Sequence, residues 1–111
     1  MRTESRIQQD CYLWFHNRYP ELRGLLFRVK NEGTNRISGA RDKAMGVVPG
    51  VSDMIFLLPA PGRPILFEFK TDTGKQSESQ KQWQSTVEKA GYQYFLIRSL
   101  NEFQEVICQH V

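Results

Sequence analysis

Three charged residues are spaced so that they could hold a metal ion and act on a phosphate. Glu68-Phe69-Lys70 places a carboxylate and an ammonium group two residues apart, and so on one face of a strand. Asp53 lies in the preceding apolar segment, which we expect to pair with that strand as a hairpin. Carboxylates on neighbouring strands repel each other unless a cation lies between them, and Mg²⁺ is commonly held by one or two carboxylates and water. The spacing therefore predicts a divalent-metal site in which Lys70 acts on the attacking water or on the phosphate.

The same residues have a simpler interpretation. An acid and a lysine two apart on a strand often form a solvated ion pair at a sheet edge, which contributes little to stability. The surrounding sequence favours the metal site, because both segments otherwise resemble the centre of a sheet, where charged residues are uncommon. The apolar neighbours are Met54, Ile55, Phe56, Ile65, Phe67 and Phe69.

Hydrophobic spacing and turn-forming residues predict the elements that position these side chains. Strands are predicted over 25–30, 51–58, 64–71 and 92–98, and helices over 4–19, 77–90 and from Ser99 onward, with a short helix around 39–45. The proline-rich turn 59–64 is expected to make an antiparallel hairpin. The order α-β-β-β-α-β-α predicts one domain over residues 1–111 of the α/β class, a small mixed β-sheet flanked by helices.

Positive charge is concentrated in the first half of the chain. The net charge is +3, and residues 1–50 hold nine basic and five acidic residues, whereas residues 51–111 hold six and seven. A basic segment of this kind suits a polyanion. We expect Arg36, Arg41 and Lys43, with Lys75 before the 77–90 helix, to contact phosphates without reading sequence. A solubilising surface stretch is the alternative interpretation.

The composition and motifs argue against several classes of protein. No apolar run approaches the ~20 residues that span a bilayer, and the start of the chain lacks the apolar core of a secretion signal. Cys11 and Cys108 lie near opposite ends without a CxxC partner, which argues against a disulfide framework or a zinc site. Trp14 and Trp83 lie on apolar helical faces and are expected in the core. We therefore expect a cytoplasmic protein with no membrane contact and no organic cofactor.

An ordered set of motifs resembles the VRR-NUC (virus-type replication-repair nuclease) branch of the PD-(D/E)XK nucleases. The resemblance extends from the first helix to about Asn101, and one departure is Ser52, which stands where the signature often has proline. The motifs that carry it are Glu4-x-x-x-Gln8, Gly50-Val51-Ser52-Asp53-Met54, Phe67-Glu68-Phe69-Lys70, Ser77-x-x-Gln80-x-x-Trp83 and Gly91.

The resemblance implies a restriction-endonuclease-like core and a metal-dependent endodeoxyribonuclease that uses Mg²⁺ or Mn²⁺. It assigns Asp53, Glu68 and the backbone carbonyl of Phe69 as metal ligands. It assigns Lys70 as the catalytic lysine, Glu4 as an auxiliary acid that reaches the metal through water, and Gln80 as a helix residue that faces the site.

Two of these assignments have alternatives. Glu4 is also placed to favour the helix dipole as a first-turn acid. Gln80 is also the third residue of a capping box that starts at Ser77.

Small members of this family are homodimers that cut branched DNA, including four-way junctions. The resemblance therefore implies DNA as the partner and a two-fold homodimer. A catalytically silent DNA-binding accessory protein with the same fold is one alternative, because fold alone does not establish function. An RNA-directed nuclease is another, although the chain has no aromatic RNA-binding signature.

Overall fold

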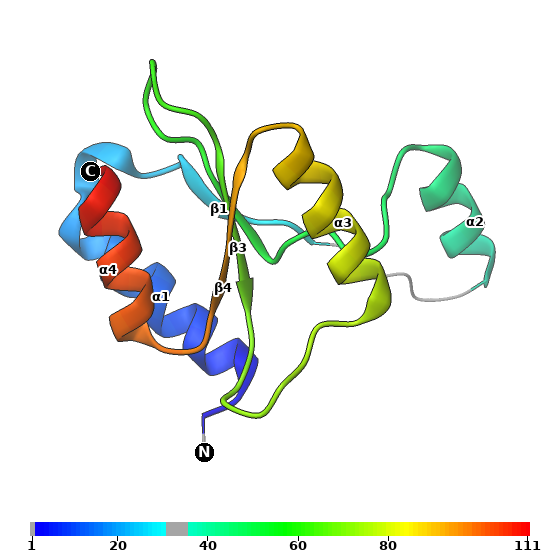
Figure 1. The fold of residues 1–111 in the computed structure, drawn as a ribbon, viewed down its shortest axis with the longest axis horizontal. Coiled ribbons are helices and arrows are strands. Elements are labelled where there is room, and N and C mark those ends of the chain that lie inside the picture. Colours follow the sequence, from blue (N-terminus) through cyan, green and yellow to red (C-terminus); the bar gives the residue numbers. More distant parts are fainter. Residues whose placement is uncertain (1, 31–35) are drawn as a thin grey trace.

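The computed structural model describes residues 2–30 and 36–111, without the side chains of 36–38, and arranges them in layers (Figure 1). Two helices, α1 and α4, cover one face of a four-stranded sheet, and α3 lies on the other face. In chain order the elements are α1 (Glu4–Arg18), the 3₁₀ helix η1 (Pro20–Leu22), β1 (Leu26–Arg28), α2 (Arg36–Ala44), β2 (Met54–Phe56), β3 (Ile65–Phe69), α3 (Glu78–Lys89), β4 (Gln93–Ile97) and α4 (Leu100–His110).

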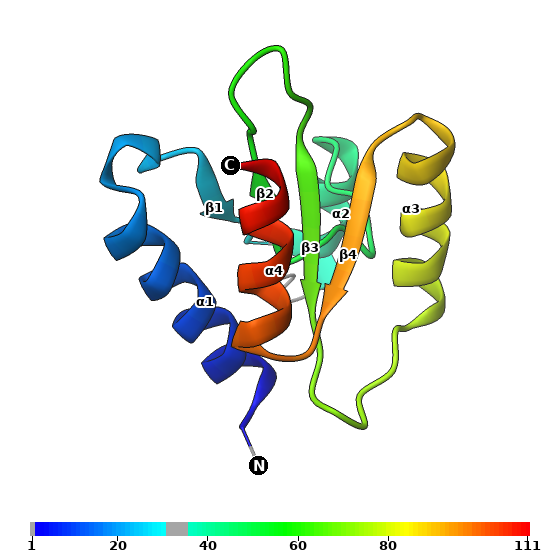
Figure 2. The same ribbon diagram turned by 60° about the vertical axis from the view of Figure 1, so that its left-hand side comes forward.

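The sheet is mixed, as the sequence predicts. Its strand order is β1-β2-β3-β4, with antiparallel pairing of β1 with β2 and of β2 with β3. Strand β4 runs parallel to β3, because α3, which connects them, returns the chain to the end of the sheet where β3 begins (Figure 2). Met54 pairs with Phe67, and Phe67 in turn pairs with Phe95. The predicted hairpin of the two motif-bearing strands is therefore confirmed.

Alternation along β3 divides its side chains between the two layers. Phe67 and Phe69 contact Phe103 of α4, with the Phe67 and Phe103 ring centroids 4.9 Å apart. Glu68, between them, faces the α3 side of the sheet, where Gln80 contacts it. All five residues of β3 are buried, so both faces of this strand are covered.

Aromatic rings fill the layer between the sheet and the helix pair α1 and α4. Phe15 of α1 lies against Phe56 of β2 with centroids 5.2 Å apart, and both rings are fully buried. Trp14 makes edge contacts with Tyr19 and Phe103, so its predicted core position is confirmed. This apolar layer holds the sheet rigidly behind the candidate site.

Helix starts follow the sequence closely. The Thr3 hydroxyl accepts a hydrogen bond from the Arg6 amide at the start of α1. Ser77 and Gln80 form the predicted capping box. At the start of α4 the Ser99 hydroxyl accepts from the Glu102 amide, but the Glu102 carboxylate accepts from the Arg98 amide, so this capping box is incomplete.

Strands are shorter than hydrophobicity predicts. The segment predicted as strand 51–58 pairs only over β2. One further hydrogen bond extends the ladder at each end: the Val29 amide donates to the Asp53 carbonyl, and the Leu57 amide donates to the Leu25 carbonyl. Before Asp53 the chain turns at Gly50, whose φ of +82° is not that of a strand. The residues ahead of Asp53, which include two glycines and a proline, therefore form a loop instead of extending the sheet, although their valines are apolar.

Both cysteines are free thiols, as their positions predict, with Cys11 buried and Cys108 exposed. Burial raises the pKa of the Cys11 thiol to about 12. Within the described part of the chain, no helix has the length and apolar content needed to cross a membrane.

Candidate active site

The centre of the sheet carries two charged side chains that are almost completely buried. Glu68 is 1% exposed and Lys70, directly after β3, is 7% exposed. They project from the same side of the chain, and Lys70 Nζ lies 3.7 Å from Glu68 Oε2. The interpretation of this motif as a solvated edge pair is therefore wrong, because β3 is an inner strand with both faces covered.

Asp53 reaches the same place from the loop that leads into β2. Its Oδ2 accepts a 2.7 Å hydrogen bond from the Phe69 amide, which fixes the carboxylate beside β3. Ser52, one residue earlier, is buried and donates from its hydroxyl to the Met54 carbonyl at 3.2 Å. The serine that replaces the usual proline thus supplies a hydrogen bond that helps to shape this loop.

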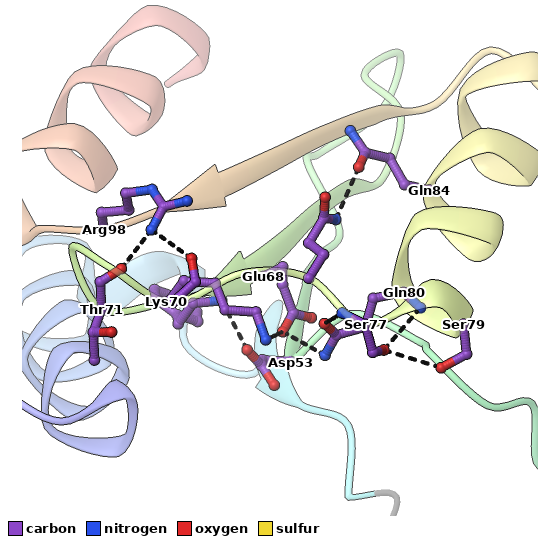
Figure 3. A network of polar contacts seen from close by, with 12 residues as sticks. Asp53, Glu68, Lys70, Thr71, Ser77, Ser79, Gln80, Gln84 and Arg98 are labelled. Atoms are coloured by element: carbon purple, nitrogen blue, oxygen red, sulfur yellow. Dashed lines mark hydrogen bonds and ion pairs between the residues drawn. The ribbon is translucent and has the colours of Figure 1, made fainter.

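The Glu68 carboxylate has one oxygen with partners and one without. Oε2 accepts from the Gln80 amide at 3.1 Å and lies near Lys70 Nζ (Figure 3). Oε1 is buried and has no hydrogen-bond partner among the described residues. A buried oxygen of this kind is costly and usually marks a place where a water, an ion or a ligand binds.

Electrostatics at this carboxylate favour a cation. Burial raises the pKa of Glu68 to about 8, and the negative charge of Asp53 is the next largest cause. The positive charge of Lys70 opposes the increase without cancelling it. A divalent cation bound by both acids would remove this repulsion, so Asp53 and Glu68 fit the metal that the resemblance implies.

The candidate site provides two acids and not three. Over the described ranges no three His, Cys, Asp or Glu side chains gather closely enough to form a ready-made metal site. Glu4, the first residue of α1, is exposed, and its charge is the smallest contribution to the raised pKa of Glu68. This position suits the predicted indirect role through water, and as a first-turn acid Glu4 also favours the dipole of α1.

Gln80 serves both of its predicted roles at once. Its Oε1 accepts from the Ser77 amide at 2.8 Å, which completes the capping box of α3. Its Nε2 donates to Glu68 Oε2. Because the two bonds fix both ends of one planar amide, the start of α3 is tied directly to the buried carboxylate.

Gly50 positions the loop before β2, a role that the sequence motifs did not predict. A Cβ at this position would lie 2.2 Å from the Ser79 carbonyl oxygen, so only glycine allows the loop to pack against the start of α3. Its φ of +82° independently favours glycine. The sequence signal was available, since the residue begins the Asp53 motif, but its contact is with a segment about 30 residues away.

Arg98, after β4, fixes the loop between Lys70 and α3. Its Nη1 donates to three carbonyl oxygens of that loop, those of Thr71, Asp72 and Gly74, the last two at 3.3 and 2.9 Å (Figure 3). No motif in the sequence pointed to this arginine, because its partners are backbone atoms.

A polar network continues from the site along α3. Gln76 donates to Gln84 Oε1 at 2.9 Å and to the Tyr94 hydroxyl at 3.2 Å. Burial, followed by the charge of Glu68, raises the pKa of Tyr94, so the phenol stays protonated. Trp83 packs against Tyr94 on the α3 side of the sheet and is only half-buried, so the prediction that it lies in the core is wrong.

A hollow of about 350 Å³ opens beside Asp53 and Glu4, and we call it the acid hollow. It is bounded by the start of α1, the end of β1, the loop before β2 and the start of α3, and Arg28 is the one basic residue in its described lining. Its lining residues include Glu4, Ser5, Gln8, Arg28, Asp53, Ser77, Ser79 and Gln80.

Among the described residues, the predicted phosphate contacts Arg41, Lys43 and Lys75 do not line this hollow. Arg41 and Lys43 are exposed on α2, which lies on the α3 side of the sheet (Figure 1), and Lys75 is exposed in the loop before α3. Arg36 begins α2, but its side chain lies outside the described residues. These four assignments remain predictions about contacts farther along a bound polymer.

Comparison with known proteins places this arrangement in a family. The model of the VRR-NUC domain matches residues 2–101. A solved structure titled "VRR_NUC domain protein" is similar over 100% of this chain and 89% of its own, with a TM-score of 0.82 at 20% sequence identity. The sequence has no significant match among curated proteins.

Proposed function

The chain belongs to the VRR-NUC domain family, whose fold is of the nuclease type, and from that premise we propose that it is a metal-dependent endodeoxyribonuclease. The observation that carries the proposal is the buried Glu68 with Asp53 and Lys70 beside it. One oxygen of the Glu68 carboxylate has no hydrogen-bond partner among the described residues. A nuclease domain takes DNA as its substrate, and hydrolysis of a phosphodiester requires charge stabilisation of this kind.

Asp53, Glu68 and the Phe69 carbonyl would hold Mg²⁺ or Mn²⁺. When bound, such an ion polarises the phosphate and lowers the pKa of its water. The Phe69 amide orients Asp53, and the Gln80 amide orients Glu68. These two hydrogen bonds preorganise the ligands before any ion arrives.

Lys70 is placed to act on the reacting groups. Its ammonium is 3.7 Å from Glu68 and almost excluded from water, so its charge is weakly screened. From this position it stabilises negative charge that develops on the phosphate and holds the attacking water by a hydrogen bond.

We further propose branched DNA, such as a four-way junction, as the substrate and a two-fold homodimer as the active form. Each copy holds one acid pair, and cutting two strands of a junction at positions related by its two-fold axis needs two such sites. Measurement of the molar mass by light scattering tests the dimer, which a monomer at micromolar concentration would contradict.

The cleavage experiment uses labelled four-way junction, flap and linear duplex DNA with Mn²⁺. We expect cleavage by the wild type that is lost in Glu68→Ala and in Lys70→Ala but kept in Lys89→Ala, a control at the exposed end of α3. Matched RNA substrates distinguish an RNA-directed enzyme. Cleavage that is equal in all four proteins would contradict the assignment.

A catalytically silent DNA-binding protein is the alternative, and calorimetry with Mn²⁺ separates it from the enzyme. Binding of Mn²⁺ that Asp53→Ala abolishes supports the enzyme. Salt-sensitive DNA binding without any Mn²⁺ binding supports the silent protein.

A further inference from the structure

Helix α2 stands apart from the rest of the molecule, beyond α3 and on the same side of the sheet as Glu68 (Figure 1). None of its described side chains, those of residues 39–44, is buried: four are exposed and two are half-buried. Its nine residues are fewer than the ~12–15 at which an isolated helix becomes marginally stable in water. The helix therefore lacks the packing that a short helix normally needs, and we expect a partner outside this chain to supply it.

The C-terminal end of α2 is nevertheless well defined. The Gly46 amide donates to the Lys43 carbonyl at 3.1 Å, and the Val47 amide donates to the Asp42 carbonyl at 2.9 Å. With the φ of +98° at Gly46, these two bonds form a Schellman motif. The chain then reaches Gly50, which packs against the start of α3. A defined turn thus joins α2 to the loop before β2.

Charge is arranged regularly around α2. At about 100° per residue, Ala40 and Ala44 share one face, and Arg41 and Lys43 lie about 80° to either side of it. All four residues are exposed, and neither cation forms an ion pair with a described residue. Asp42, the one acid in the sequence of the helix, lies on the opposite side. We call the surface formed by Ala40, Arg41, Lys43 and Ala44 the α2 face.

The α2 face has the charge and width that suit the major groove of a duplex. That groove is about 12 Å wide and admits an α-helix, which is about 10–12 Å across. When a helix enters the groove, cations on its two flanks reach the phosphates of both strands, and these contacts position the helix without reading sequence. Arg41 and Lys43 occupy the two flanks, and the side of the helix that carries Asp42 is turned away from the groove. A single strand has no groove and offers only one row of phosphates.

We propose that α2 binds in the major groove of a duplex arm of the substrate, with Arg41 and Lys43 on the phosphates of the two strands. This rests on the proposed function for the identity of the polymer as DNA. Asp53 is ten residues after Lys43, a distance of at most about 34 Å along an extended chain, which is close to one turn of DNA. The duplex arm is therefore held within about one helical turn of the cleaved phosphate.

A second copy of this chain is the other candidate occupant of the α2 face. If α2 met its own copy, like charges would face each other, which is unfavourable. The side chains between the two cations are alanines and offer little apolar area to a protein partner. The larger apolar side chains of this region, those of Met45, Val47 and Val48, come after the helix. Charge complementarity therefore favours DNA as the occupant.

The test measures binding of a labelled blunt duplex and of labelled oligothymidylate by fluorescence anisotropy, in EDTA so that nothing is cleaved. Arg41→Gln and Lys43→Gln should each reduce the slope of log duplex affinity against log salt by about 0.9, which is about fivefold in affinity at about 0.15 M salt. Ala40→Glu, which places a carboxylate on the α2 face, should weaken duplex binding at least about tenfold. Binding of the single strand should change less in all three variants, because it has no groove.

Lys89→Gln and Ser85→Glu are matched controls at exposed positions of α3, and they make the same changes in charge. All five altered positions are exposed, so circular dichroism should show folded proteins throughout. Equal weakening by the controls would overturn the proposal, because charge alone and not its place on α2 would then set the affinity. An unchanged salt slope in either Arg41→Gln or Lys43→Gln would also overturn it, as would an equal loss of single-strand and duplex binding.

Three further outcomes separate this proposal from the others. A lower molar mass in Arg41→Gln or Ala40→Glu by light scattering would assign the α2 face to a dimer interface and overturn the proposal. Because the binding assay contains no metal, duplex binding that depends on α2 in a protein that cleaves nothing would contradict the proposed function alone. Cleavage by a protein whose duplex binding does not depend on α2 would contradict the role of α2 alone.

Discussion

On one face of β3, Ile65, Phe67 and Phe69 lie in the aromatic layer under α1 and α4; on the other, Glu68 faces α3 with Lys70 next to it. Side chains on both faces are excluded from solvent, since Phe67, Phe69 and Glu68 are all 1% exposed or less. The faces differ in how completely their groups are satisfied. The apolar face is packed by rings, whereas the polar face keeps a buried carboxylate oxygen that has no partner in the described part of the chain.

That difference shows how one strand supports both folding and chemistry. Packing on the apolar face stabilises the strand while the opposite face buries ionisable groups, which oppose folding when they are charged. The unsatisfied oxygen is therefore a cost that the fold tolerates where a cation is expected. Four experiments test whether the apolar face mainly supports stability and the polar face mainly supports chemistry.

The largest effect is expected from the apolar face. Phe67→Ala should lower the free energy of unfolding by about 3–5 kcal/mol, because it leaves a cavity between Phe95 and Phe103. Glu68→Gln should change it far less or raise it, since a neutral amide is cheaper to bury. Urea unfolding at neutral pH in EDTA measures both, and an equal loss in the two variants would contradict the comparison.

Lys70→Met should affect catalysis far more than stability. Losing a charged group beside the reacting phosphate commonly costs about 10²–10³ in rate. The methionine fills a similar volume, so the protein should remain folded at the same urea concentrations. Cleavage of branched DNA with Mn²⁺ is the measurement, with Lys89→Met as the exposed control. A rate within about twofold of wild type would remove Lys70 from the mechanism.

The raised pKa of Glu68 predicts that stability falls as pH rises. Below its unfolded value of 4.5 the carboxyl is protonated in both states, and between 4.5 and about 8 the folded state retains a proton that the unfolded state has lost. The free energy of unfolding from this group should therefore decrease between pH 5 and 8, by at most about 3–4 kcal/mol.

Thermal unfolding in EDTA across this pH range measures the effect. The difference between wild type and Glu68→Gln isolates the group, because the amide does not titrate. Parallel curves for the two proteins would show that Glu68 titrates normally.

The smallest effect separates the two roles of Gln80. Gln80→Ala removes both the cap of α3 and the amide on Glu68, whereas Ser77→Ala removes only a capping hydroxyl. Each should cost about 1 kcal/mol in stability. Only Gln80→Ala should weaken Mn²⁺ binding, by about tenfold as for other residues that orient a ligand. Calorimetry that finds equal Mn²⁺ affinity in both variants would leave Gln80 with a capping role alone.

Much of the fold could be predicted because its signals are local. The Ser77 and Gln80 capping box, the alternation of β3 and the proline-rich turn each depend on residues a few positions apart. Strand ends were less predictable, because Val51 is as apolar as the residues that pair but follows a glycine that turns the chain.

Asp53, Glu68 and Lys70 could be proposed as a group because hairpin pairing follows from the turn between their strands. Their environment could not be predicted. The hydrogen bonds from the Phe69 amide to Asp53 and from Gln80 to Glu68 depend on how the loop before β2 and the start of α3 approach the sheet. The same holds for Arg98, whose carbonyl partners lie at least 24 residues away.

The sequence by itself determined the family, the order of elements and the charged residues worth testing, because these depend on residue type and short spacing. Tertiary structure alone decided that Glu68 is buried with one oxygen that has no hydrogen-bond partner among the described residues, and that Gly50 must be glycine. The physical reason is that burial, dielectric environment and close backbone approach are set by segments distant in the chain, which no local pattern records.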